Sequence, residues 1–279
     1  MSAFEELNFL LSNRIPRRLA TRLMGWFSHI ESRALARLSI ALWRRFSDLD
    51  LQDAQSERYP SLHACFTREL KPGARPVAHD PRLLASPCDG IIVAAGEIRG
   101  ESLIQAKGLA YTLSELLRDA ALAEAYRDGR YVTLRLTPSM YHRFHAPYDL
   151  TVTQVSYIAG DTWNVNPPAL KRIARLYCRN ERAVLQTSLA GSGHRITLVP
   201  VAAILVAGIK LRFLDLLLYE AYGGATHIRC AARLGKGEEM GWFEHGSTII
   251  LLAPQGFALA AGARIGSRIR MGEPLLQLP

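Results

Sequence analysis

Three short segments of this 279-residue chain contain residue types that hydrolytic or self-processing chemistry requires. Asp89 stands in an Asp-Gly turn before an apolar segment, and a Tyr-His-Arg-Phe-His run places His142 and His145 after another. Ser247 follows Gly246 and leads into a third apolar segment. Each segment alone is typical of an ordinary turn. Together, a carboxylate, a histidine and a serine can serve as orienting group, base and nucleophile at any sequence separation.

The residues around Ser247 limit what this serine can do. They lack the Gly-x-Ser-x-Gly pattern of α/β-hydrolases, and they lead into a strand instead of a helix. A serine that follows a glycine at a tight turn can instead attack the carbonyl group of that glycine and convert the amide into an ester, if the turn is strained and the oxyanion is stabilised. His142 and His145 have no HExxH-type partner, so we expect no metal site.

Many short apolar or alternating segments, separated by Gly and Pro turns, predict the elements that position these residues. The predicted strands are 91–94, 131–136, 151–157, 183–189, 196–209, 226–232 and 248–252. Thr112 and Glu115 have capping-box spacing, which predicts one helix through Leu117, Leu122 and Tyr126 that ends near Gly129. Residues 211–222 fit either a helix or two strands. We therefore expect an α+β fold in which N-terminal amphipathic helices precede a mainly antiparallel, barrel-like β core.

The N-terminal region carries most of the net charge of +9, with eight arginines and one glutamate between residues 14 and 45. Its apolar residues recur at steps of three or four, as on one face of a helix. Such a segment suits an anionic membrane surface, although two helices packed on the core with a basic outer side remain an alternative. No nucleic-acid motif accompanies the charge, so we expect no nucleic-acid partner.

Charge-free stretches and cysteine spacing predict the location of the protein. The longest charge-free apolar run, 196–209, is too short to span a bilayer. The four cysteines form no CxxC pair, which favours a reducing environment. We expect a peripheral protein on the cytoplasmic side of the cell membrane.

The order of several motifs resembles the phosphatidylserine decarboxylases, a family of pyruvoyl-dependent enzymes. The motifs are Ser86-Pro-Cys-Asp-Gly90, Gln105-Ala-Lys-Gly108 with Tyr111, Tyr141-His-Arg-Phe-His145, Gly160-Asp161 with Asn164-Val-Asn166, Arg179-Asn-Glu-Arg182, and Lys236-Gly-Glu-Glu-Met-Gly-Trp-Phe243 before Gly246-Ser-Thr248. The last motif is the most specific, because it adjoins the self-cleavage site of the family.

The resemblance implies a role for each candidate residue. Asp89 orients His145, His145 takes the proton of Ser247, and Ser247 attacks Gly246. The resulting ester is broken by β-elimination, and Ser247 becomes a pyruvoyl group, the covalent cofactor derived from serine. That group forms a Schiff base with the amine of phosphatidylserine, which loses carbon dioxide to give phosphatidylethanolamine. His142 holds the substrate carboxylate or supplies a proton.

Composition predicts a boundary between a basic membrane-docking segment, residues 1–55, and a catalytic domain, residues 56–279. The resemblance predicts how the chain is cleaved. Cleavage yields a heterodimer of a large chain, 1–246, and a small pyruvoyl chain, 247–279. His245 replaces the usual Leu of the family and Cys88 replaces a small apolar residue, but the intact Gly-Ser pair predicts that processing survives.

Two other functions are compatible with the residues. A membrane-associated serine hydrolase would use Asp89, His145 and Ser247 without self-cleavage. A non-catalytic barrel domain would not require Ser247 at all.

Overall fold

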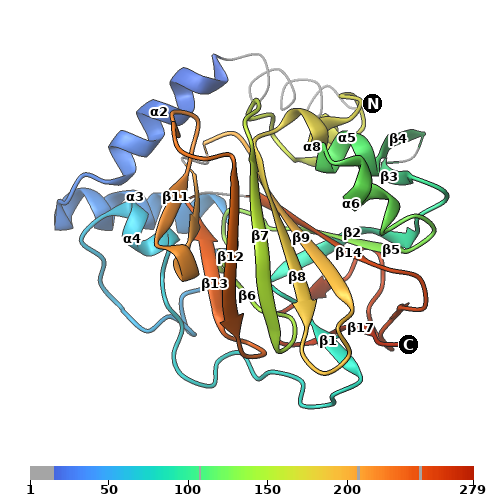
Figure 1. The fold of residues 1–279 in the computed structure, drawn as a ribbon. Helices are drawn as coiled ribbons and strands as arrows, with labels where there is room; N and C mark the ends of the chain where they lie inside the picture. Colours follow the sequence, from blue (N-terminus) through green and yellow to red (C-terminus); the bar gives the residue numbers. More distant parts are fainter. Residues whose placement is uncertain (1–15, 107, 206–207, 245–246) are drawn as a thin grey trace.

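A computed structural model describes residues 16–106, 108–205, 208–244 and 247–279, and its largest element is an eight-stranded antiparallel sheet (Figure 1). The strands lie in the order β12-β7-β8-β9-β14-β5-β2-β16. Their bounds are β12 His227–Leu234, β7 Leu150–Ile158, β8 Arg182–Leu189, β9 Arg195–Ala202, β14 Ser247–Ala253, β5 Arg130–Arg135, β2 Gly90–Glu97 and β16 Arg268–Ile269. All seven residues of β14 are buried, because this strand lies between β9 and β5. Ser247 therefore begins a central strand of the core.

Smaller antiparallel sheets complete the β structure. One has the order β11-β10-β13-β6, and the strands are β11 Leu216–Leu218, β10 Ile209–Leu211, β13 Glu239–Phe243 and β6 Arg143–His145. The others are β1-β17-β15 and β3-β4, with β1 Leu83–Ala85, β17 Pro274–Gln277, β15 Ala258–Leu259, β3 Ser102–Ala106 and β4 Leu109–Thr112. The expected α+β class with mainly antiparallel sheets is confirmed. Within the described residues β12 and β16 do not pair with each other, so "barrel-like" describes the open sheet only loosely.

Seven α-helices lie in the described residues, and the three N-terminal ones gather on one side of the sheets (Figure 1). These are α2 Arg17–Ser28, α3 Arg33–Phe46 and α4 Leu62–Phe66. The shorter helices are α5 Leu113–Leu117, α6 Ala120–Glu124, α7 Pro167–Leu170 and α8 Leu176–Arg179. The capping box of Thr112 and Glu115 is present, but the prediction of one helix through Tyr126 is wrong. Arg118 adopts a left-handed conformation with φ +52° that ends α5, and Asp119 caps the start of α6.

Most predicted strands are found, and the exception lies between the two large sheets. The predicted strand 196–209 is wrong as one element, because β9 ends at Ala202 and β10 begins at Ile209 in the four-stranded sheet. Leu205, with φ +67°, marks the change of direction. Residues 211–222, which fitted either a helix or two strands, form the 3₁₀ turn η1 Arg212–Leu214 and the strand β11.

Both amphipathic helices leave a stripe of large apolar side chains exposed. The side of α2 that faces the core is built from small and polar residues, namely Thr21, Gly25 and Ser28. The large exposed residues on the two helices are Leu19, Leu23, Trp26, Leu38, Leu42 and Phe46. The alternative in which the apolar side packs on the core is therefore wrong. No helix within the described residues is long and apolar enough to cross a membrane.

Polar contacts fix α2 to the body of the protein. The guanidinium of Arg17 lies 2.7 Å from the Asp161 carboxylate and 3.5 Å from the ring centroid of Trp163. The hydroxyl oxygen of Thr21 accepts a hydrogen bond from the Leu205 amide at 3.0 Å. These contacts orient α2 so that its apolar stripe remains exposed.

Candidate active site

Ser247 is fully buried at the first position of β14. It pairs with Ala202 of β9, and its carbonyl oxygen accepts a hydrogen bond from the Leu136 amide at 2.9 Å. Its hydroxyl group makes no hydrogen bond to any described residue. A buried hydroxyl without a partner is costly, and a catalytic role is one of the explanations for such a group. Gly246 and His245, which complete the expected cleavage motif, lie outside the described residues.

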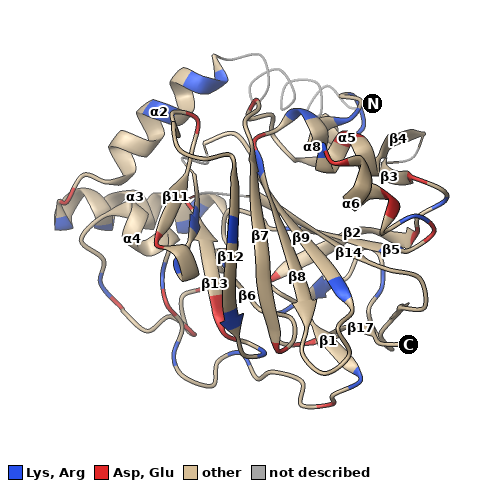
Figure 2. Ribbon diagram, in the orientation of Figure 1, with Lys and Arg blue, Asp and Glu red and all other residues tan. Residues whose placement is uncertain are grey.

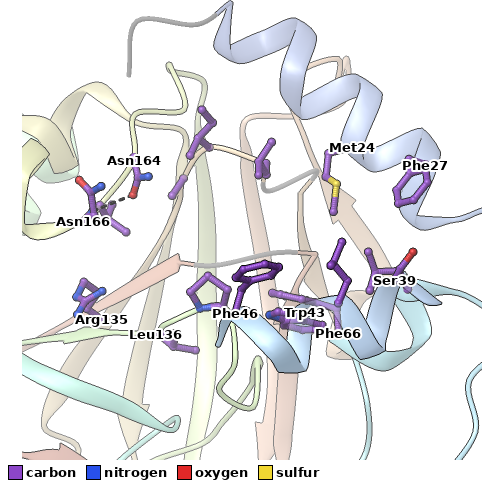
Figure 3. A pocket seen from close by; sticks show the side chains of 17 residues that line it. Met24, Phe27, Ser39, Trp43, Phe46, Phe66, Arg135, Leu136, Asn164 and Asn166 are labelled. Carbon is purple, nitrogen blue, oxygen red and sulfur yellow. Dashed lines mark hydrogen bonds between the residues drawn. The ribbon is translucent and has the colours of Figure 1, made fainter. Parts of the chain in front are cut away.

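A cavity of about 620 Å³ lies between helices α2, α3 and α4 and residues that follow or end the central strands (Figure 3). Two lining residues adjoin Ser247. Leu136 is hydrogen-bonded to the Ser247 carbonyl, and Ala203 follows Ala202, the residue that pairs with Ser247 in the sheet. The helices contribute mainly apolar side chains to the lining: Met24, Phe27, Ser39, Leu42, Trp43, Phe46, Leu62 and Phe66. The volume and lining are those of a site for a largely apolar ligand.

Polar groups gather at one part of this cavity. Arg135, the last residue of β5, pairs with Thr248 and lines the cavity. Burial lowers the pKa of Arg135, and no carboxylate of the described residues forms an ion pair with it. Asn164 and Asn166 line the cavity as well, and the backbone amide of Asn166 donates to Asn164 Oδ1 at 2.9 Å (Figure 3). A half-buried cation beside a buried serine can bind an anionic group of a ligand.

His142 is fully buried beside the cavity wall. Its ring centroid lies 4.0 Å from that of Phe66, which lines the cavity. His142 Nδ1 donates to the Met140 carbonyl at 2.7 Å, since a carbonyl oxygen can only accept. The Phe243 amide donates to the His142 carbonyl at 3.1 Å, which places this histidine against the segment that leads to Ser247.

Asp89 lies in a separate polar hollow of about 190 Å³. Arg75 donates to the Asp89 carboxylate through Nε at 2.9 Å and Nη2 at 2.7 Å, and the Met271 amide donates to it at 2.9 Å. Arg75 also binds Asp53 at 2.7 Å. Two carboxylates share this guanidinium, and they raise its pKa despite its partial burial.

His145 has a buried ring whose two nitrogens both have partners. Nδ1 donates to the Gly237 carbonyl at 2.9 Å, so Nε2 of the neutral ring accepts from the Tyr141 hydroxyl at 3.0 Å. Burial lowers the pKa of His145, which favours the neutral, basic form. The ring can therefore accept a proton at Nε2.

The structure groups the expected residues in two places. Ser247 and His142 lie beside the apolar cavity, whereas Asp89 lines the polar hollow with Tyr141, the hydrogen-bond partner of His145. The His145 amide donates to the Pro87 carbonyl at 2.7 Å, which brings the Asp89 turn next to His145. Within the described residues no hydrogen bond joins the side chains of Asp89, His145 and Ser247, so their relay stays a prediction.

Sequence reasoning assigned no role to Arg75, Arg135 or Tyr141. Tyr141 lies within one of the recognised motifs, and its place four residues before His145 was the available indication. Arg75 and Arg135 stand among many arginines, and nothing in their spacing distinguishes them.

Other motif residues have structural roles that position the strands around Ser247. Gln105 binds three backbone groups, at Leu170, Ile173 and Leu176. The Asn180 amide donates to the carbonyl of Ala202, the partner of Ser247, at 2.8 Å. Arg182 is fully buried and donates to backbone carbonyls at 2.7–3.0 Å.

Comparison with known proteins gives one consistent result. The family model described as "Phosphatidylserine decarboxylase" matches residues 62–277. A protein of Coxiella burnetii (strain RSA 493 / Nine Mile phase I), named phosphatidylserine decarboxylase proenzyme, is 38% identical over 251 residues that cover 88% of each chain. Proteins with the same name from Halorhodospira halophila and Saccharophagus degradans are 38% and 34% identical, and the matches cover 95% and 98% of this chain and 91% and 98% of theirs.

Proposed function

Because this chain belongs to the phosphatidylserine decarboxylase family of enzymes, we propose that it converts phosphatidylserine to phosphatidylethanolamine and carbon dioxide in the cavity beside Ser247. The observation that carries the proposal is that an apolar cavity of about 620 Å³ is lined by Leu136, whose amide donates to the Ser247 carbonyl, while the buried Ser247 hydroxyl has no hydrogen bond to a described residue. The relatives are named proenzymes, which fits a chain that must process itself before it is active.

Self-processing starts with Ser247 in this proposal. Its hydroxyl oxygen attacks the Gly246 carbonyl, His145 takes the proton, and the amide becomes an ester. β-Elimination then releases the carboxylate of Gly246, and the dehydroalanine left at position 247 takes up water and loses ammonia to become pyruvoyl. The products are a large chain, 1–246, and a small chain, 247–279, which remain together as a heterodimer. The neutral ring of His145 supports its role as the base.

The surroundings of Ser247 fit a small carbonyl group at this position. The buried hydroxyl makes no hydrogen bond to the described part of the chain, and the adjacent cavity offers space for a substrate amine. A pyruvoyl group supplies a conjugated carbonyl that withdraws the electron pair released with carbon dioxide. The chain's own residues must then bind the substrate, exclude water and donate a proton.

Arg135 and the two asparagines of the cavity suit the polar end of phosphatidylserine. Arg135 is a cation without a carboxylate partner within the described residues, so it can bind the phosphate or the carboxylate of the substrate. The apolar lining then faces the glycerol and the first part of the acyl chains. In this proposal His142, whose ring lies against Phe66 of the cavity wall, holds the carboxylate or supplies the proton.

The exposed stripe of α2 and α3 supports membrane docking. Leu42 and Phe46 are exposed and also line the cavity, so the apolar surface continues from the helices into the site. A lipid can pass along this surface without exposing its acyl chains to water. Figure 2 shows basic residues on both helices, and four of them, Arg33, Arg37, Arg44 and Arg45, are exposed and form no ion pair with described residues. They can bind anionic headgroups at the cytoplasmic face of the membrane.

The intact mass of the purified protein under denaturing conditions tests the self-processing. We expect two chains that divide between Gly246 and Ser247, the smaller one lighter than its encoded mass by one ammonia. Ser247→Ala should remain one chain and should not release carbon dioxide from phosphatidylserine in detergent micelles. A single chain of full mass in an active preparation would refute the pyruvoyl mechanism and favour a serine hydrolase.

A further inference from the structure

A cluster of two histidines and one glutamate lies outside the catalytic groups. His29 follows the end of α2, His63 belongs to α4, and Glu244 follows the end of β13. Their ligand atoms lie within 4.8 Å of one another, and no other group of three His, Cys, Asp or Glu residues in the described chain converges in this way. Catalysis as proposed above uses none of the three residues.

The three side chains meet around one carboxylate oxygen. His63 Nε2 is in direct contact with Glu244 Oε2, and His29 Nε2 lies 3.8 Å from the same oxygen. The two imidazole rings are stacked with their centroids 3.9 Å apart. The Nε2 atoms of the two rings therefore both lie near the same buried carboxylate oxygen.

Neighbouring groups orient the potential ligand atoms. His29 Nδ1 donates to the Gly25 carbonyl at 2.8 Å, which leaves the lone pair of the neutral ring on Nε2, toward Glu244. Trp242 Nε1 donates to Glu244 Oε1 at 3.1 Å and thereby holds the other carboxylate oxygen. Histidine and carboxylate ligands of metals have such outer hydrogen bonds.

From this arrangement we propose that His29, His63 and Glu244 bind one Zn²⁺ ion. Two imidazole nitrogens and one carboxylate oxygen are a known zinc donor set, with a fourth position left for water. Ligands bound at 2.0–2.1 Å in a tetrahedron are about 3.3 Å apart, and His29 Nε2 lies 3.8 Å from Glu244 Oε2, so these two atoms would approach each other by about 0.5 Å on binding. Binding requires that the direct contact between His63 and Glu244 lengthens. It also requires that the exposed ring of His29 tilts out of its stack on His63, because the lone pair of an imidazole nitrogen lies in the plane of its ring.

The ion would join three elements that are distant in sequence. His63 and Glu244 are 181 residues apart, which is why the sequence shows no recognisable metal-ligand spacing and we expected no metal. Bound zinc would fix the end of α2 to the chain two residues before Gly246. This site is independent of the proposed decarboxylation, so either proposal can fail alone.

Calorimetric titration of the untagged, chelator-treated full-length protein with zinc chloride tests the proposal. We expect one equivalent of Zn²⁺ to bind and to raise the melting temperature. His29→Gln and His63→Gln should each weaken binding by more than about 100-fold, because even outer-sphere partners contribute 10–100-fold. His79→Gln changes an exposed histidine outside the cluster and is the matched control; it should bind as the wild type does.

The exposed position of His29 keeps this test interpretable. Its side chain is 53% exposed, so His29→Gln should fold normally, which its circular dichroism spectrum can verify. Absence of stoichiometric binding by the wild type would overturn the proposal. Unchanged affinity in His29→Gln would overturn it as well.

Discussion

Phe46 offers the sharpest test of how the protein reaches its substrate. It ends helix α3, is 80% exposed and also lines the cavity beside Ser247. If α2 and α3 dock on the membrane, the Phe46 ring becomes buried in the bilayer, whereas it is exposed in the free protein. Phe46→Ser should therefore weaken binding to vesicles and leave folding nearly unchanged.

The size of the effect follows from the exposed ring. Complete burial of a Phe side chain is worth about 1.5–3 kcal/mol. Since each 1.4 kcal/mol corresponds to a factor of ten, the partition coefficient should fall by about 10- to 100-fold. The Ser247→Ala background keeps the lipid composition constant, because it prevents turnover during the measurement.

Flotation with vesicles of phosphatidylserine and phosphatidylcholine measures this partition. Ile265→Ser is the matched control, because Ile265 is also exposed, at 61%, but lies between β15 and β16 at the C-terminal end of the chain. It should bind as the parent protein does. Equal losses in the two variants, or no loss in Phe46→Ser, would refute the assignment of α2 and α3 as the docking surface.

Four further outcomes follow from charged and titratable groups. Replacing Arg37 and Arg44 with Gln should weaken binding to anionic vesicles by about 1 kcal/mol per charge and leave binding to neutral vesicles unchanged; equal losses on both would contradict a headgroup role. Arg135→Gln should raise KM for phosphatidylserine by at least about tenfold while self-cleavage, followed by intact mass, continues; an unchanged KM would exclude Arg135 as the anion-binding group. Burial raises the pKa of Glu181 to about 7 from 4.5. The folded state thus retains a proton that the unfolded state loses, and stability falls as pH rises from about 4.5 to 7. In urea titrations Glu181→Gln should gain up to about 3 kcal/mol relative to wild type at pH 8 and little at pH 4.5; an equal gain at both values would contradict this cause. Because the pKa of His145 is lowered, self-cleavage should persist when pH falls through about 6.5, the ordinary histidine value; loss of cleavage with a midpoint above that value would exclude this histidine as the base.

Local patterns in the sequence determined many elements and the family. Alternating apolar segments predicted most of the strands, because alternation and burial on one face are properties of consecutive residues. The capping box of Thr112 and Glu115 was readable for the same reason, since both partners lie within one turn. Motif order likewise predicted the family, which the comparisons confirm.

Only the tertiary structure decided which face of the amphipathic helices is buried. Steps of three and four place Leu19, Leu23 and Trp26 on one face, but they do not tell whether that face meets the core or the solvent. The choice depends on distant partners, such as Asp161 for Arg17, that bind the polar side of α2.

The same limit applies to the site. The sequence indicated Ser247 and the two histidines, but not the arginine that binds Asp89, the tyrosine that binds His145, or the cluster around Glu244. Each of these contacts joins side chains through space after the strands have paired. Their distances depend on strand register and helix packing, which no local pattern in the chain encodes.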